Sequence, residues 1–181
     1  MAHEFTASYL KDSLSLFRHY KKLAAAIAQV ADEQLFASPD PETNSIAITM
    51  KHMAGNMRSR WRDFLTTDGE KPDRRRDTEF EDPPATREAL MATWEAGWNH
   101  VFGALEPLSD ADLNRQVTIR GEPHSVMQAI NRQMAHYAYH IGQVVQLAKH
   151  YGHADWRSLT VPRHKSDDFN ARVKAGEASQ R

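Results

Sequence analysis

The chain contains no cysteine among its 181 residues. This absence excludes disulfide bonds, thiolate metal ligands and a cysteine nucleophile. Ten histidines and 24 acidic residues remain as side chains that bind divalent ions. We therefore expect any metal site in this protein to be built from imidazole and carboxylate groups.

Long apolar runs are also absent. No segment approaches the roughly 18 consecutive apolar residues that a membrane-spanning helix needs. The N-terminal residues Met-Ala-His-Glu-Phe-Thr lack the basic and apolar regions of a secretory signal peptide. These absences predict a cytoplasmic protein with no membrane partner.

An excess of charge of one sign is missing as well. The net charge is −1, so the composition gives no general signal for binding nucleic acid. The one basic cluster, Arg74–Arg76, is flanked by Asp73 and Asp77. Mixed charges of this kind predict a solvated loop rather than a track for phosphate groups.

What the sequence does contain is helical periodicity. Apolar residues recur at spacings of three and four over residues 5–31, 45–66, 86–106 and 126–151. The last segment opens with Ser125-Val-Met-Gln128, a capping-box pattern that predicts the start of a helix. Four amphipathic helices with one shared core predict an all-α fold, a four-helix bundle, in a single domain over residues 1–181.

The connections are expected to be of three kinds. The polar residues from Glu70 to Pro84 predict a long loop between the second and third helices. Val117–Ile119 and the turn Arg120–Pro123 predict a short extended excursion before the last helix. The polar end, about residues 171–181, is expected to be a frayed tail.

The most informative feature is a pair of histidines, His136 and His140, four residues apart in the last predicted helix. Positions i and i+4 project from the same helical face, so two imidazoles can reach one divalent ion. His52, in the second predicted helix, is the candidate third ligand. Three imidazole ligands leave a coordination position for water or substrate, as in catalytic metal sites.

Two histidines four residues apart also occur in zinc peptidases. In those enzymes a glutamate general base follows the first histidine, but here that position is Tyr137. A metallopeptidase is therefore disfavoured. Solvent-facing or hydrogen-bonded histidines remain the alternative to a metal site.

Four polar residues flank the candidate ligands by about one helical turn. Gln133 and Gln143 lie on the last predicted helix, while Asn56 and Arg60 lie on the second. We expect these four side chains to orient the ligands or to contact a substrate.

Several stretches carry a resemblance to a known family, the longest being Lys51–Met57, Asp63–Pro72 and Asn131–Gln143. Through them the chain resembles the DinB-like (YfiT-like) superfamily of metal-binding four-helix bundles, and in particular its uncharacterised bacterial subgroup. The resemblance implies a ligand triad of His52, His136 and His140, with nickel or zinc as the divalent ion. It also implies one long crossover connection and a homodimer.

The resemblance also bears on the reaction. Some members of that superfamily transfer low-molecular-weight thiols such as bacillithiol, and others use mycothiol in isomerisation. A metal-dependent transferase that activates a small thiol is therefore the leading expectation for this chain. A metal-dependent hydrolase and a non-catalytic metal-binding protein of the stress response are the alternatives.

Overall fold

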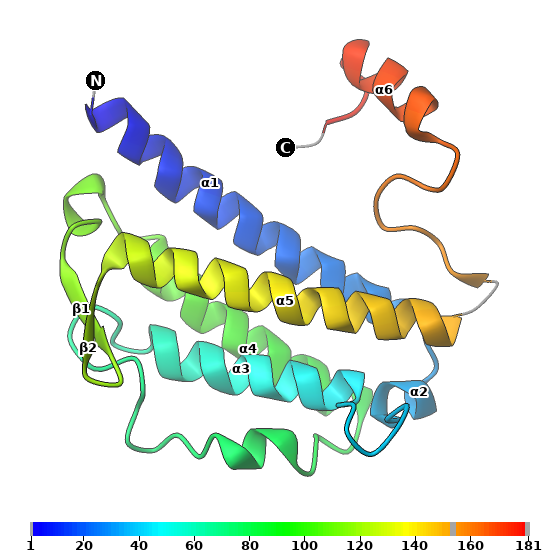
Figure 1. The fold of residues 1–181 in the computed structure, drawn as a ribbon, viewed down its shortest axis with the longest axis horizontal. Coiled ribbons are helices and arrows are strands. Elements are labelled where there is room, and N and C mark those ends of the chain that lie inside the picture. Colours follow the sequence, from blue (N-terminus) through cyan, green and yellow to red (C-terminus); the bar gives the residue numbers. More distant parts are fainter. Residues whose placement is uncertain (1, 153–154, 180–181) are drawn as a thin grey trace.

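The computed structural model describes residues 2–152 and 155–179, and in these residues the protein is mostly helical. The described residues form six α-helices and one two-stranded antiparallel sheet (Figure 1). The four long helices are α1 (Ala2–Leu23), α3 (Ile46–Trp61), α4 (Arg87–Leu105) and α5 (Val126–Gly152). Helical segments at all four predicted places confirm the mainly α fold.

Each long helix contributes an aromatic side chain to one buried cluster. The ring of Phe17 in α1 lies 6.1 Å from that of Trp61, 6.2 Å from that of Trp98 and 5.7 Å from that of Tyr137, measured between centroids. These partners belong to α3, α4 and α5, and all four rings are at most 2% exposed. Such pairs stabilise a core beyond their area of apolar burial.

The first predicted helix is broken into parts. The α-helix ends at Leu23 rather than at residue 31, and Ala24–Gln29 continue as a 3₁₀ helix, η1. Arg87 of α4 helps to keep the α-helix from continuing to residue 31, because its guanidinium donates to the backbone oxygens of Ile27 at 2.9 Å and Val30 at 2.7 Å. A short helix that was not predicted, α2 (Asp32–Phe36), follows.

Helix α3 begins as predicted and ends earlier. The hydroxyl of Ser45 accepts a hydrogen bond from the amide of Ile48 at 3.1 Å, which caps the first turn. The predicted end at residue 66 is wrong, because Arg62 is extended and Asp63 has a φ of 50°. Arg62 is directed to Asp73, which its guanidinium contacts at 2.6 Å.

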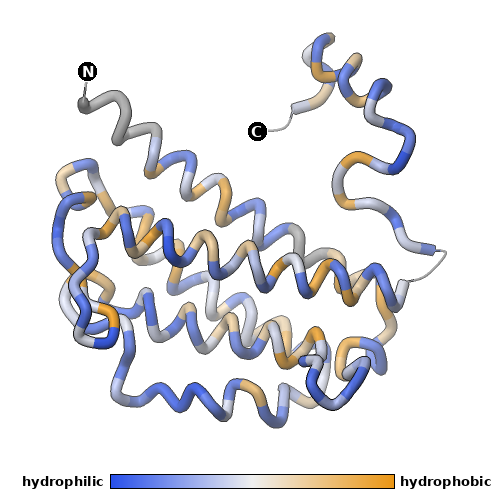
Figure 2. The backbone as a smooth tube through the Cα atoms, in the orientation of Figure 1, coloured by the Kyte–Doolittle hydropathy of each residue, from blue (hydrophilic) through white to orange (hydrophobic). Residues whose placement is uncertain are grey.

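The long connection between α3 and α4 contains a 3₁₀ helix, η2 (Asp77–Phe80), and runs along the outer side of α3 (Figure 1). It is largely hydrophilic (Figure 2). Lys51 of α3 fixes it, because its ammonium donates to the backbone oxygens of Thr78, Glu81 and Asp82 at 2.5, 2.6 and 3.2 Å.

The prediction of a solvated Arg74–Arg76 cluster is wrong at its first residue. Arg75 and Arg76 are exposed, but the side chain of Arg74 is only 4% exposed. Arg74 is buried because it forms ion pairs with Glu70 and Glu79 on the same connection. A buried arginine needs such partners.

The predicted extended excursion is a hairpin. Strands β1 (Gln116–Ile119) and β2 (Glu122–Ser125) pair in antiparallel register. The two turn residues, Arg120 and Gly121, both have positive φ, at 57° and 78°. Asp68 accepts hydrogen bonds from both turn amides at 2.8 Å, which ties the hairpin to the α3–α4 connection.

Helices α4 and α5 also start at side-chain caps, of which only the Ser125–Gln128 capping box was predicted. Thr86 accepts from the amide of Ala89 at 3.2 Å before α4. Ser125 and Gln128 exchange the two capping-box hydrogen bonds at the start of α5, at 2.8 and 3.1 Å. The predicted boundaries of these two helices are confirmed within one residue.

The C-terminal region contains a helix that was not predicted, α6 (Ser166–Lys174), which lies away from the long helices (Figure 1). The expected frayed tail therefore overlaps a helix over residues 171–174. Residues 180–181 of that predicted tail lie outside the described residues. Among the helices that the structure describes, none is long and apolar enough to span a membrane.

Candidate metal centre

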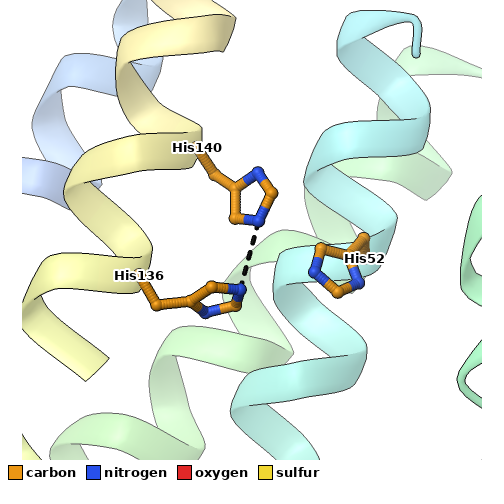
Figure 3. A group of neighbouring side chains, drawn as sticks. All are labelled: His52, His136 and His140. Atoms are coloured by element: carbon orange, nitrogen blue, oxygen red, sulfur yellow. Dashed lines mark hydrogen bonds between the residues drawn. The ribbon is translucent and has the colours of Figure 1, made fainter. Parts of the chain in front are cut away.

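Three histidines from two helices face one another (Figure 3). His136 and His140 project from one face of α5, and His52 projects from α3 toward them. One ring nitrogen of each lies within 4.8 Å of the other two. The Nε2 atoms of His136 and His140 are 3.1 Å apart. Two nitrogens bound tetrahedrally at about 2.0–2.1 Å lie roughly 3.3 Å apart, so the pair suits one shared ion.

The ring of His52 is held at its edge and on its face. Its Nδ1 lies 2.9 Å from Oε2 of Glu79. Phe80 stacks on the ring with a centroid distance of 4.5 Å. Since His52 is also only 4% exposed, its ring has little freedom to rotate.

The charge of Glu79 defines which nitrogen of His52 carries a proton. Burial raises the pKa of Glu79, but hydrogen bonds and charge from Arg74 and His52 lower it below the usual value. An ionised carboxylate only accepts hydrogen bonds, so Nδ1 of His52 is the donor. With the ring proton on Nδ1, Nε2 keeps its lone pair for a metal ion.

Arg74 holds Glu79 in this position. Its Nε and Nη2 donate to the two carboxylate oxygens at 2.8 and 2.9 Å. Its Nη1 donates to Glu70 at 3.1 Å. The bidentate contact fixes the plane of the Glu79 carboxylate. A chain of contacts therefore runs from Glu70 through Arg74 and Glu79 to His52.

His140 has a neutral partner instead. Its Nδ1 lies 2.8 Å from the side-chain oxygen of Gln143, so the imidazole donates there and Nε2 faces His136. Burial lowers the pKa of His140, and the contact with Gln143 opposes this shift. The ring is therefore neutral at neutral pH, which is the form that binds metals.

His136 is the most strongly perturbed of the three. Burial, followed by the proximity of His140 and His52, lowers its pKa to about 3. Its Nδ1 is buried and has no hydrogen-bond partner among the residues described. Neutral imidazoles with converging nitrogens are a donor set that suits zinc, nickel and related ions.

Asn56 and Gln133 join the two helices next to His136. The Gln133 amide donates to the side-chain oxygen of Asn56 at 2.7 Å and to the hydroxyl of Tyr137 at 3.1 Å. Trp61 donates to the same hydroxyl at 2.8 Å. Burial raises the pKa of Tyr137, which keeps this hydroxyl protonated. The network fixes the separation of α3 and α5 beside the histidines.

Arg60 is buried at 5% exposure and lies further along α3. Its Nη1 donates to the backbone oxygen of Gly69 and to Glu70, the latter at 3.0 Å. Arg60, Asn56 and Gln133 border a cavity of about 220 Å³ that His52 and His136 also line. Of the four predicted flanking residues, Gln143 alone is not on this cavity, because it contacts His140 from the exposed side.

The partners of His52 were not predicted from the sequence. Glu79, Phe80 and Arg74 all lie in the segment that was predicted to be a polar loop. The one local signal was an aromatic residue next to an acidic one in an otherwise hydrophilic stretch. That pattern does not reveal a contact with a helix 27 residues earlier.

A family model described as a protein of unknown function (DUF1572) matches residues 4–165. The chain belongs to the DUF1572 family. DUF1572 is a DinB-like family, which supports the resemblance at that level. The match includes the three histidines and Glu79, and it ends one residue before α6. No curated protein and no solved structure matches the chain.

Proposed function

We propose that this DUF1572 protein is a DinB-type four-helix bundle that binds one divalent ion, nickel or zinc, through His52, His136 and His140. We further propose that it is a transferase that uses the ion to activate a low-molecular-weight thiol. The observation that carries the proposal is the convergence of three imidazoles. In two of them a hydrogen-bond partner on Nδ1 fixes which ring nitrogen carries the proton. Glu79 accepts a hydrogen bond from Nδ1 of His52, and Gln143 accepts one from Nδ1 of His140. The Nε2 atoms of these two rings are therefore the ligand atoms.

A divalent ion held by neutral imidazoles would lower the pKa of a bound thiol or water toward neutrality. Glu79 and Gln143 would hold two rings in orientation while substrates exchange. The hydroxyl of Tyr137 stays protonated and serves as a hydrogen-bond donor rather than a base. Because the chain has no cysteine, the reacting sulfur must come from a cosubstrate.

The first test is the metal content of untagged protein that has been purified without added metal. We expect close to one equivalent of nickel or zinc and a lower melting temperature after chelation, because an ion that binds the folded state stabilises it. An unchanged melting temperature after confirmed metal removal would contradict an interhelical site.

The second test addresses the reaction. The protein is incubated with a panel of small thiols and the electrophile monochlorobimane. Turnover that disappears on chelation and returns with a divalent ion supports thiol transfer. Cleavage of esters or amides without thiol reaction would support the hydrolase instead. Silence in both assays, with an ion that still raises the melting temperature, would support a non-catalytic metal-binding protein.

Two further parts of the proposal are independent of the chemistry. The superfamily resemblance supports a homodimer, which size-exclusion chromatography with light scattering tests directly. The second part is a cytoplasmic location, which fractionation of cells expressing the untagged protein tests.

A further inference from the structure

We propose that the cavity beside the histidines binds the anionic end of a small organic substrate that carries at least two negative charges. The proposal names a substrate class for the same site and so rests on the proposed function. It is carried by an excess of arginine around a cavity that opens on two of the three histidines.

The cavity has a volume of about 220 Å³ and lies between α3, α5, the hairpin turn and the α3–α4 connection. No carboxylate belongs to the part of its lining that the structure describes. Its polar lining is instead dominated by guanidinium groups. These belong to five arginines, Arg60, Arg74, Arg76, Arg120 and Arg132.

The nearby acids neutralise only part of this charge. Glu70 contacts three of the arginines, namely Arg60, Arg74 and Arg120. Glu79 contacts Arg74. Asp77 lies 3.9 Å from Arg76. Three carboxylates against five guanidinium groups leave an excess of two positive charges around the cavity. Positive charge on low-dielectric walls raises the local concentration of anions.

Three of the arginines have hydrogen-bonding capacity that the protein does not use. The Nε of Arg60 is buried without a partner among the described residues. Arg132 forms no ion pair within the part of the chain that the structure describes. Arg76 stacks on Phe80 at 4.9 Å, and its contact with Asp77 is long, at 3.9 Å. A buried donor without an acceptor is unfavourable, and an anion in the cavity would supply acceptors.

The size of the cavity limits what enters it. Sites for whole small molecules usually measure roughly 300–1,000 Å³. A cavity of about 220 Å³ is suited to one end of such a molecule. The planar guanidinium fork matches a carboxylate or a phosphate group. Because His52 and His136 form part of the same wall, the rest of the bound molecule would extend toward the histidines.

The test measures binding of succinate, inorganic phosphate and the neutral analogue succinamide by calorimetry, on the full chain before and after chelation. We compare the wild type with Arg132→Gln, an exposed position on the cavity, and with Arg75→Gln. Arg75 is the matched control, because it is exposed and lies on the α3–α4 connection but not on this cavity.

We expect at least one dianion to bind and succinamide not to bind. Arg132→Gln should lower the affinity for the dianion by about tenfold, which corresponds to the loss of one charge-assisted hydrogen bond of roughly 1.5 kcal/mol. Arg75→Gln should leave its affinity within about twofold of the wild type, because a surface charge away from the site is largely screened. A preference for phosphate or for succinate would identify the group that the substrate carries.

Absence of binding by both anions would overturn the proposal, as would equal weakening in the two variants. The measurements on chelated protein separate this proposal from the metal site. Anion binding to a protein that never retains metal would uphold the cavity and refute the metal proposal. Metal retention without anion binding would do the reverse.

Discussion

Nδ1 of His52 donates a hydrogen bond to Oε2 of Glu79 at 2.9 Å. The carboxylate comes from the α3–α4 connection, outside the helix that carries the histidine. Its acceptor-only character leaves the opposite nitrogen of the ring for an ion. The α3–α4 connection thus takes part in the site as directly as the helices do.

This contact predicts the effect of Glu79→Gln. The amide oxygen of glutamine could accept from both His52 and Nη2 of Arg74, but its N–H₂ group would then face Nε of Arg74, which the second carboxylate oxygen now accepts from. The bidentate contact that fixes the position of the group is therefore lost. We expect metal affinity to fall by about 10–100-fold, the usual effect of losing such a partner. Competition with a chromophoric chelator measures it. Asp77→Asn is the control, because that side chain is 97% exposed, and equal affinity in the two variants would contradict the assigned role of Glu79.

A substitution at Gly55 should weaken metal binding although it changes none of the three histidines. A Cβ at this position in α3 would lie 2.5 Å from Oε1 and 2.7 Å from Cδ of Glu79. Since Arg74 anchors that carboxylate, Gly55→Ala should displace it and weaken metal binding severalfold.

Gly142→Ala is the matched control for this variant. Gly142 also lies in a helix, and an added Cβ would meet no atom within 4 Å. We expect unchanged metal affinity and up to about 1 kcal/mol of added stability from helix propensity. A loss of affinity in both variants would refute the steric explanation.

The histidine triad makes the most direct prediction. His52→Ala, His136→Ala and His140→Ala should each reduce metal occupancy at least about tenfold, because two remaining imidazoles hold an ion less tightly than three. His100→Ala, on α4, should retain the ion. Inductively coupled plasma mass spectrometry on protein purified in parallel measures occupancy. A full equivalent of metal in His140→Ala would exclude that residue as a ligand.

Stability of the metal-free protein should depend on pH below about 6.5, the pKa of histidine in an unfolded chain. The folded protein keeps the pKa of His136 at about 3, so the unfolded chain takes up a proton that the folded chain does not. As the pH is lowered through this range, the free energy of unfolding should therefore decrease by up to about 1.4 kcal/mol per pH unit. Urea unfolding between about pH 6.5 and 4.5 tests this before most carboxylates titrate.

His136→Gln should reduce that pH dependence, because it removes the group whose pKa is lowered to about 3 in the folded protein. His140, whose pKa burial also lowers, retains part of the dependence. His19→Gln, at an exposed position on α1, should leave it unchanged. An equal slope in the wild type and His136→Gln would show that other groups cause the loss of stability.

The parts of the molecule that depend on local spacing could be predicted from the sequence. Residues four apart on a helix share a face whatever surrounds them, so His136 and His140 were placed correctly together. The Ser125–Gln128 capping box is equally local, and it marked the start of α5. His52 was a candidate third ligand from the residues alone, and the family resemblance supported its pairing with these histidines, because no spacing rule relates residues on different helices.

What the sequence did not reveal depends on contacts between distant residues. The first helix does not run to residue 31, and Arg87, far along the chain, binds the carbonyl groups of Ile27 and Val30 beyond its end. Arginine is usually exposed, and Arg74 is buried because it forms ion pairs with Glu70 and Glu79. The role of Glu79 could not be predicted either, because it depends on the path of the α3–α4 connection along α3.

Lys51 and His52 are neighbours in α3, and both hold the segment that contains Glu79. Opening of this segment would release the lysine and remove the carboxylate that orients the histidine. Local unfolding and ion binding are therefore linked, and the linkage is reciprocal. An ion at the histidines would slow hydrogen exchange in the segment, whereas anything that kept the segment open would hasten release of the ion.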